Sequence, residues 1–273
     1  MKILFYLNKK NKIKIQANDG IHAAGKKIFE SAGFSVTTEK VAQENLGSML
    51  NNFDAILVRS ATQVRKEHID AAPNLKLIGR AGVGMDNIDV KYARDAGRIV
   101  VNTPAASSQS VAELVFAHLF TGVRYIHDSS RNLTASENKE TFDALKKKYS
   151  SGIELRGKTI GIIGAGQIGK SVAAMAVGLG MNVMFHRLNN EDVIVDLDFH
   201  PAIGKSKVSV AFKCVSFTKI LIESDFITMH VPFPKGAKPV IGKQELDLMK
   251  PGSAIVNTAR GGVVSEMDLL DAL

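Results

Sequence analysis

The 273-residue sequence has a single cysteine, Cys214, and no apolar run that approaches the ~18 residues of a membrane span. One cysteine excludes an internal disulfide and a CxxC metal motif, and it agrees with a reducing compartment. Residues 1–5 are typical of a first strand rather than of a signal peptide. We therefore expect a soluble, cytoplasmic protein with no bound metal and no membrane partner.

Clustered positive charge is also scarce, although the net charge is +8. Lysine and arginine are dispersed except at residues 9–14 and 146–148, and neither cluster has interleaved aromatic residues. A nucleic-acid surface would concentrate basic residues on one face. Solvated faces with a general attraction for anionic metabolites are therefore favoured over a nucleic-acid partner.

The sequence does contain enough apolar residues for a large core, at 45% hydrophobic and 23% charged. Up to residue 101, short apolar strands alternate with helical segments. Strands are expected at 2–7, 35–38, 55–59, 75–80 and 98–101, and a helix near 22–32. This alternation predicts a parallel sheet with right-handed crossovers, whose ligands bind at the carboxyl ends of the strands.

A largely apolar helix is expected over residues 111–125, with Ser110 as its N-cap, and its apolar character on all sides is typical of a buried helix. The polar, lysine-rich residues 127–151 predict an exposed arm. A second α/β region follows, with strands at 158–163, 181–186, 226–230 and 254–257, and helices at 170–179 and 265–273.

Alternating apolar and polar residues at 192–199 and 207–213 predict a β-hairpin inserted into this second region. For the hairpin we expect surface decoration or an oligomer contact. The fold class predicted for the chain is α/β, with two Rossmann- or flavodoxin-like parallel-sheet domains.

The loop Gly164-Ala165-Gly166-Gln167-Ile168-Gly169 lies between an apolar strand and a helix. In a dinucleotide-binding turn, the first glycine allows the tight turn, the second lets the backbone approach the pyrophosphate, and the third permits close helix–strand packing. The helix N-terminus adds unpaired N–H groups and the positive end of a dipole. Because both flanks are in place, this loop predicts an NAD(P) site.

The strand after this loop ends in Arg187, where an acidic residue would hydrogen-bond the ribose 2′-hydroxyl of NAD. An arginine cannot accept a hydrogen bond from the hydroxyls but can pair with a 2′-phosphate, which favours NADP. Glu191 or Asp192 could fold back and restore NAD binding. The sequence leaves NAD and NADP both open, with NAD as the default.

Three further stretches surround the glycine loop: residues 58–62 (VRSAT), residues 79–89 (GRAGVGMDNID) running on to 102–104 (NTP), and residues 256–262 (VNTARGG). In this order they closely resemble the D-2-hydroxyacid dehydrogenase family, most of all its 3-phosphoglycerate dehydrogenase branch, over essentially the whole chain. The resemblance implies an NAD(P)-dependent oxidoreductase that oxidises 3-phosphoglycerate to 3-phosphohydroxypyruvate in serine biosynthesis. It also implies a substrate-binding lid domain at 1–101, an NAD(P)-binding Rossmann domain at 102–273, and a homodimer formed through residues 105–150.

Arg260 follows a strand and precedes two glycines, which predicts a position at a strand's carboxyl end, towards the cofactor crevice. A guanidinium there can hold a carboxylate in bidentate fashion and polarise a neighbouring carbonyl. The resemblance implies that Arg260 is the catalytic arginine. Residues 80–84 form a second glycine-containing loop, whose backbone N–H groups can cradle a carboxylate.

The resemblance also implies the remaining site residues. Those that bind substrate are Arg59, Ser60, Arg80, Gly82, Val83 and Ser107, with the two arginines near the substrate phosphate. Those that bind the cofactor are Thr103, Gly164, Gly166, Gln167, Ile168, Gly169, Arg187, His230, Val231, Pro232, Thr258 and Ala259.

Oxidation of a 2-hydroxy acid needs a base for the hydroxyl proton, and histidine suits this role. In the family a Pro-His pair supplies the base and a glutamate pairs with it, both beyond the arginine motif. None of the 7 histidines here follows a proline, and the sequence ends at Leu273. We therefore expect a truncated chain with both domains incomplete and without activity of its own. The alternatives are a glyoxylate or hydroxypyruvate reductase, and a non-catalytic, NAD(H)-sensing binding protein similar to the corepressors built on this fold.

Overall fold

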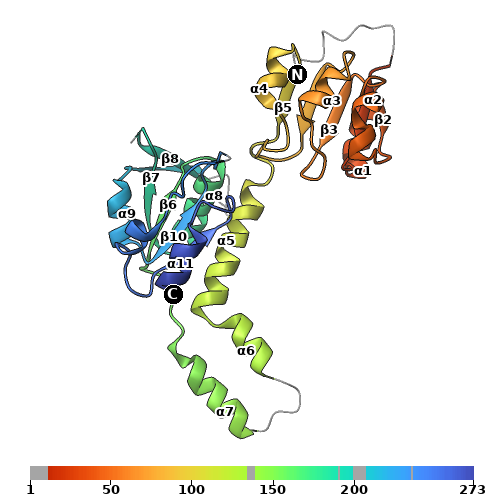
Figure 1. Cartoon of the computed structure of the whole chain (residues 1–273). Helices are drawn as coiled ribbons and strands as arrows, with labels where there is room; N and C mark the ends of the chain where they lie inside the picture. The colour runs from red at the N-terminus through yellow and green to blue at the C-terminus, as the bar shows by residue number, and fades with distance from the viewer. Residues whose placement is uncertain (1–11, 134–138, 190, 199–206, 235) are drawn as a thin grey trace. The chain divides into compact units, whose positions relative to one another are not determined.

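The structure is a computed structural model that describes residues 12–133, 139–189, 191–198, 207–234 and 236–273 (Figure 1). It divides into two compact units, Met1–Ala106 (unit 1) and Ser107–Leu273 (unit 2), each of which is described by itself. Within the described ranges, none of the helices combines the length and the apolar character that crossing a bilayer requires.

Unit 1 is built on a five-stranded parallel sheet in the order β2-β1-β3-β4-β5. Its strands are β1 (Lys14–Ala17), β2 (Ser35–Thr37), β3 (Ala55–Val58), β4 (Leu77–Arg80) and β5 (Ile99–Asn102). Its helices are α1 (Ala23–Ser31), α2 (Leu46–Leu50, after the 3-10 turn Gln43–Asn45), α3 (Lys66–Asp70) and α4 (Val90–Asp95). The predicted parallel sheet is confirmed, and its order is that of flavodoxin-like folds, whose ligand crevice opens between β1 and β3.

The first strand of the described sheet differs from the prediction. The strand expected at residues 2–7 lies outside the described residues, and β1 begins at Lys14, inside a lysine cluster that we assigned to a solvated face. Lys14 itself is exposed, but Ile15 and Ala17 are buried and β1 pairs with strands on both sides. Burial on a central strand therefore outweighs the local charge.

Both faces of this sheet are covered by apolar side chains. Ile56, Ile78 and Val100 belong to a buried cluster that also takes in α2, α3 and α4. Ile15 and Ala55 belong to a second cluster, against which Phe29 of α1 packs. Burial on two faces accounts for the continuous apolar runs of these strands.

Unit 2 begins with α5 (Ser108–Val123), α6 (Ile126–Asn132), α7 (Lys139–Lys148) and the 3-10 turn Tyr149–Ser151. Its four-stranded parallel sheet has the order β11-β10-β6-β7 and consists of β6 (Thr159–Ile163), β7 (Asn182–His186), β10 (Phe226–Met229) and β11 (Ala254–Asn257). The other helices are α8 (Gln167–Gly178), α9 (Phe217–Glu223), α10 (Lys243–Leu246) and α11 (Glu266–Ala272). Because β6 lies between β7 and β10, the strand order reverses at β6, which is where such sheets bind ligands.

Helix α5 begins earlier than predicted. Its N-cap is Ser107, and Ser110 lies inside the helix, where its hydroxyl donates to the Ser107 carbonyl at 3.0 Å. The helix buries one face, including Val115, Phe116 and Leu119, and packs on α8. On another face of the helix, Leu114 is 48% exposed. The polar arm that follows is helical, as α6 and α7, and neither helix has a buried residue.

The predicted hairpin is confirmed: β8 (Val193–Asp198) pairs antiparallel with β9 (Lys207–Phe212). Its expected role as surface decoration is wrong. Val193 and Val195 are each 1% exposed and belong to the main core cluster of unit 2, together with residues of α8. Phe212 packs edge-on against Phe185 of β7, with ring centroids 5.7 Å apart. The hairpin is therefore a layer of the core.

Candidate functional site

The glycine loop of unit 2 connects β6 to α8. Gly164 has φ +104°, and a Cβ there would lie 2.5 Å from the carbonyl oxygen of His230. A Cβ at Gly169 would overlap the carbonyl oxygen of Gly164. The first glycine is therefore required by the turn and by the neighbouring strand end, and the third by the contact between helix and loop.

Gly166 has a different environment, because a Cβ there would meet nothing within 4 Å. It is the N-cap of the 12-residue helix α8 and makes no side-chain cap. The N–H groups of the first helical turn, at Gln167, Ile168 and Gly169, therefore begin beside open space, with the positive end of the helix dipole behind them. An anionic pyrophosphate fits this cradle.

Beside the glycine loop lies an apolar cavity of about 660 Å³, a size usual for small-molecule sites. It brings together four predicted cofactor residues from three loops: Gly164, Arg187, Val231 and Pro232. The rest of the wall has no motif in the sequence and consists of Ile163, His186, Leu188, Asn189, Phe217 and Val240. An apolar wall of this size suits the adenosine half of a dinucleotide.

His230 follows β10 and directly precedes Val231 of this wall. Its backbone N–H donates to the Ile163 carbonyl at 2.8 Å, and its Nε2 lies 3.0 Å from the Thr228 hydroxyl. Burial lowers the pKa of His230 to about 4. The ring is therefore neutral at pH 7, and its role is to pack and hydrogen-bond rather than to supply positive charge.

Arg187 follows β7 and is half-buried in the cavity wall. Its guanidinium Nη2 lies 3.3 Å from Oε2 of Glu191, four residues on. The structure thus joins in one ion pair the arginine predicted for a 2′-phosphate and one of the two carboxylates predicted for the ribose hydroxyls.

The loop after β11 carries Thr258, Ala259 and Arg260. The Asn257 side chain fixes its shape, because its Oδ1 accepts from the Ala259 N–H at 3.0 Å and its Nδ2 donates to the Arg260 carbonyl at 2.8 Å. Arg260 is exposed, and the Thr258 hydroxyl is buried without a hydrogen-bond partner among the described residues. Since the strands are parallel, this loop lies at the same edge of the sheet as the glycine loop.

In unit 1, Arg59 directly follows β3, and Arg80 is the last residue of the neighbouring strand β4. The register pairs Val58 with Arg80. Arg80 is half-buried, and its Nε has no partner among the described residues. Its guanidinium lies so close to Gly82 that a Cβ there would overlap it. In the described part of the chain, neither arginine forms a salt bridge with a carboxylate, so the two guanidinium groups offer positive charge at this strand edge.

The loops around these arginines are fixed by side chains that were given no role from the sequence. The Asp19 carboxylate accepts from the Arg59 N–H at 2.6 Å and from the Thr62 hydroxyl at 2.6 Å. Asn87 donates to the carbonyls of Arg59 and Thr62 at 2.8 and 2.6 Å. Burial alone would raise the pKa of Asp19, but hydrogen bonds from Thr62 and Arg59 outweigh it and lower the pKa below its usual value. The position of Asp19 shortly after a strand was the available signal, but no strand was predicted at Lys14–Ala17.

The other predicted residues of this region occupy the neighbouring loops. Asn102 donates to the Val83 carbonyl at 2.8 Å, and the Thr103 N–H donates to the Gly82 carbonyl at 3.2 Å. Ser60 and Thr103 are exposed. Ser107 caps α5 in unit 2. The structure thus gathers Arg59, Arg80, Gly82 and Val83 in unit 1, and the glycine loop and Arg260 in unit 2.

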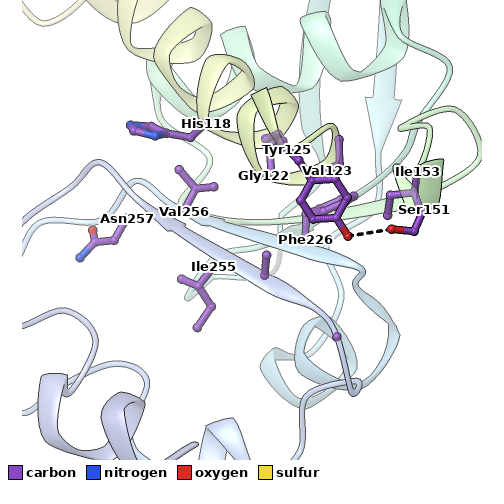
Figure 2. A pocket seen from close by; sticks show the side chains of 13 residues that line it. His118, Gly122, Val123, Tyr125, Ser151, Ile153, Phe226, Ile255, Val256 and Asn257 are labelled. Carbon is purple, nitrogen blue, oxygen red and sulfur yellow. Dashed lines mark hydrogen bonds between the residues drawn. The ribbon is translucent and has the colours of Figure 1, made fainter. Parts of the chain in front are cut away.

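A second cavity of unit 2, of about 560 Å³, contains none of the predicted site residues. Figure 2 shows it between the end of α5, with His118, the following residue Tyr125 before α6, and strand β11, with Ile255 and Asn257. The Ser151 hydroxyl lies 3.4 Å from the Tyr125 hydroxyl at one side. No lysine, arginine or carboxylate is among the described residues that line it, so it does not suit an anionic cofactor.

Comparisons with known proteins agree with this geometry. The model of the family described as D-isomer specific 2-hydroxyacid dehydrogenase, NAD binding domain, matches residues 116–273. D-3-phosphoglycerate dehydrogenase of Methanocaldococcus jannaschii is 38% identical over 96% of this chain, and the match spans 46% of that protein. Hydroxypyruvate reductase of Thermotoga maritima is 36% identical over 94% of the chain and 78% of that protein. This chain thus spans less than half the length of the first of these relatives.

Among solved structures, 3-phosphoglycerate dehydrogenase of Entamoeba histolytica with bound NAD+ superposes with a TM-score of 0.70 and 26% identity, covering 96% of this chain and 76% of that one. The glycine cradle, the apolar cavity and the matched NAD-binding model agree on NAD as the cofactor of unit 2. The chain belongs to the D-2-hydroxyacid dehydrogenase family.

Proposed function

We propose that this chain is part of an NAD-dependent dehydrogenase that oxidises 3-phosphoglycerate to 3-phosphohydroxypyruvate, a step of serine biosynthesis. The observation that carries the proposal is the pair of arginines at adjacent strand ends of unit 1, Arg59 and Arg80, which lack carboxylate partners among the described residues. A phosphate is the ligand that paired guanidinium groups hold best. The relative named D-3-phosphoglycerate dehydrogenase supports the same substrate.

Unit 2 holds the cofactor in this proposal. The pyrophosphate binds at Gly166 and the first turn of α8, and the adenosine half enters the apolar cavity between Arg187 and Val231. NAD would supply the hydride acceptor for the hydroxyl-bearing carbon, and the hydroxyl proton would pass to a base. The chain's own contribution is to hold the cofactor and to keep water away from its adenosine half.

Arg260 holds the substrate carboxylate and polarises the forming carbonyl. Its loop is shaped in advance by Asn257, so little ordering remains when the substrate binds. An arginine suits both tasks because its planar fork binds a carboxylate in bidentate fashion and keeps its charge at any working pH.

Reduction of hydroxypyruvate is the second candidate function. The relative named hydroxypyruvate reductase matches over 78% of its own length, more than the phosphoglycerate dehydrogenase does. An unphosphorylated substrate would leave Arg59 and Arg80 without a phosphate to bind, which is why we rank it second.

A calorimetric titration of the chain with 3-phosphoglycerate and with D-glycerate, in the presence of NADH, tests the choice of substrate. We expect 3-phosphoglycerate to bind on the order of tenfold or more tightly, and this preference to disappear in Arg59→Gln and Arg80→Gln. Arg124→Gln, an exposed arginine of unit 2, is the matched control. Equal binding of the two acids by the unmodified chain would favour the reductase.

A second copy of the chain is the proposed partner, bound through α6 and α7. These helices bury no residue within unit 2 and leave Ile126 and Phe142 about half exposed. Such apolar side chains on an arm are typical of a subunit contact. Light scattering should give a dimer mass that Phe142→Asp reduces and Met267→Asp, on exposed α11, leaves unchanged. A monomeric unmodified chain would contradict this contact.

A further inference from the structure

We propose that the cofactor site accepts the 2′-phosphate of NADP(H), with Arg187 as the residue that binds it. The inference rests on the proposed function, because it concerns the cofactor of the same reaction. It extends that proposal from the adenosine cavity to the group that distinguishes the two nicotinamide dinucleotides.

Selectivity for NAD at this point of the fold depends on negative charge. A carboxylate at the end of the second strand accepts hydrogen bonds from the ribose hydroxyls and repels a phosphate in the same place. In this chain the strand is β7, and the residue that follows it is Arg187. That position therefore has no carboxylate to repel a phosphate, and it carries a guanidinium group that attracts one.

The positions of Arg187 and Glu191 show which of these two side chains lies toward the cofactor. Arg187 lines the cavity and its side chain is 33% exposed, whereas Glu191 is outside the described lining and its side chain is 69% exposed. The carboxylate therefore lies on the solvent side of the guanidinium. For Glu191 to bind the ribose it would have to displace Arg187 from the wall.

The backbone around these residues opposes such an exchange. The Cys214 thiol donates to the Glu191 carbonyl at 3.0 Å, and the Val215 N–H donates to the Phe185 carbonyl at 2.8 Å. Two residues after Glu191, Val193 is buried in the core as the first residue of β8. The inserted hairpin thus holds Glu191 at the outer side of the loop.

The charge of the residues that line the cavity also favours a bound phosphate. Among the described residues that line it, Arg187 is the only lysine, arginine, aspartate or glutamate. The ion pair of Arg187 with Glu191, outside the lining, joins residues i and i+4 and is partly exposed, which makes it a weak interaction. A doubly charged phosphate that is bound in bidentate fashion competes well with such a partner.

Quenching or enhancement of nicotinamide fluorescence on titration with the full chain measures both affinities without turnover, and the chain has no tryptophan to interfere. We expect NADPH to bind at least as tightly as NADH. Arg187→Asp should weaken NADPH on the order of 10- to 100-fold, the range for one charged hydrogen-bonding partner, and should change NADH by less than about threefold. Glu191→Gln should strengthen NADPH binding, because it removes the competing carboxylate.

Arg156→Asp is the matched control. It makes the same change of charge in the same unit, but Arg156 lies beside Gly180, before the start of β7, whereas Arg187 follows the end of that strand. Both affinities should stay as in the unmodified chain. Circular dichroism of each variant checks folding, and Arg187→Gln repeats the test without adding a negative charge.

NADH that binds more than about tenfold more tightly than NADPH, or an NADPH/NADH ratio unchanged by Arg187→Asp and Arg187→Gln, would overturn this inference and leave the proposed dehydrogenase intact. Failure of the folded, unmodified chain to bind either dinucleotide would instead overturn the proposed function, and this inference with it.

Discussion

Replacement of Gly164 by alanine should lower the stability of the fold, whereas replacement of Gly166 by alanine should lower the affinity for the cofactor. Only one residue separates the two glycines. At Gly164 the new methyl group would lie 2.5 Å from the His230 carbonyl oxygen, and φ is +104°. The left-handed conformation costs about 1–2 kcal/mol for a residue with a Cβ, and overpacking against a fixed neighbour costs about 1–3 kcal/mol. We therefore expect Gly164→Ala to lower the free energy of unfolding by about 2–5 kcal/mol.

At Gly166 the same methyl group meets nothing within 4 Å, and φ is −74°, which any residue adopts. Loss of glycine at an N-cap costs at most about 1 kcal/mol. The methyl group does, however, project into the space assigned to the pyrophosphate. Gly166→Ala should therefore fold normally and weaken NADH on the order of 10- to 100-fold, as expected when a charge-assisted hydrogen bond is lost.

Thermal unfolding and NADH titration of the two variants, measured side by side, give the comparison. For a domain of this size about 1 kcal/mol corresponds to about 2–4 °C, so Gly164→Ala should lower Tm by about 4–20 °C. The reasoning is refuted if Gly164→Ala keeps the Tm of the unmodified chain, or if Gly166→Ala binds NADH as tightly as that chain does.

Three further changes test other parts of the two units. His230 has a pKa lowered to about 4, so the unfolded chain takes up a proton more readily below pH 6.5, and stability falls as the pH decreases towards 4. Urea unfolding at pH 7.5 and 4.5 should show an extra loss of about 1–2 kcal/mol, after allowance for partial exposure, that is absent in His230→Gln. Asp19→Asn should cost about 1–2 kcal/mol and weaken 3-phosphoglycerate through the Arg59 loop, with NADH affinity unchanged. Val195→Asp should cost at least about 3 kcal/mol, because it buries a charge in the core through the hairpin.

Each of these has a control and a contradicting result. If the free energy of unfolding of His230→Gln depends on pH in the same way as that of the unmodified chain, another titratable group causes the dependence. For Asp19→Asn, titration with D-glycerate is the comparison, and an equal loss for both acids would indicate general damage to unit 1. Ile194→Asp, whose position on the same strand is 50% exposed, should be nearly neutral, and an equal cost at both positions would contradict the assigned face of β8.

Much of the fold is a local property of the sequence. The strand at Thr159–Ile163, the three glycines and the helix from Gln167 lie within one short segment, so their spacing alone predicted the turn that the structure contains. The pairing of β8 with β9 was predicted for the same reason, since alternation with period two is visible in each strand. Arg59 and Arg80 in unit 1, and Arg260 in unit 2, could be placed at strand ends because each ends or follows an apolar run. In each sheet, parallel strands put such ends at one edge.

Tertiary structure decided what depends on residues far apart in the chain. Only the folded sheet shows that β1 begins within a lysine cluster, because burial by β2 and β3 outweighs its local charge. Asp19 meets the loop at Arg59 across 40 residues, and the hairpin becomes a core layer only when it packs on α8. The glycine pattern, by itself, determined that a dinucleotide binds. Which of Arg187 and Glu191 lies in the cavity wall was decided by packing, because side-chain burial depends on contacts that spacing in the sequence does not encode.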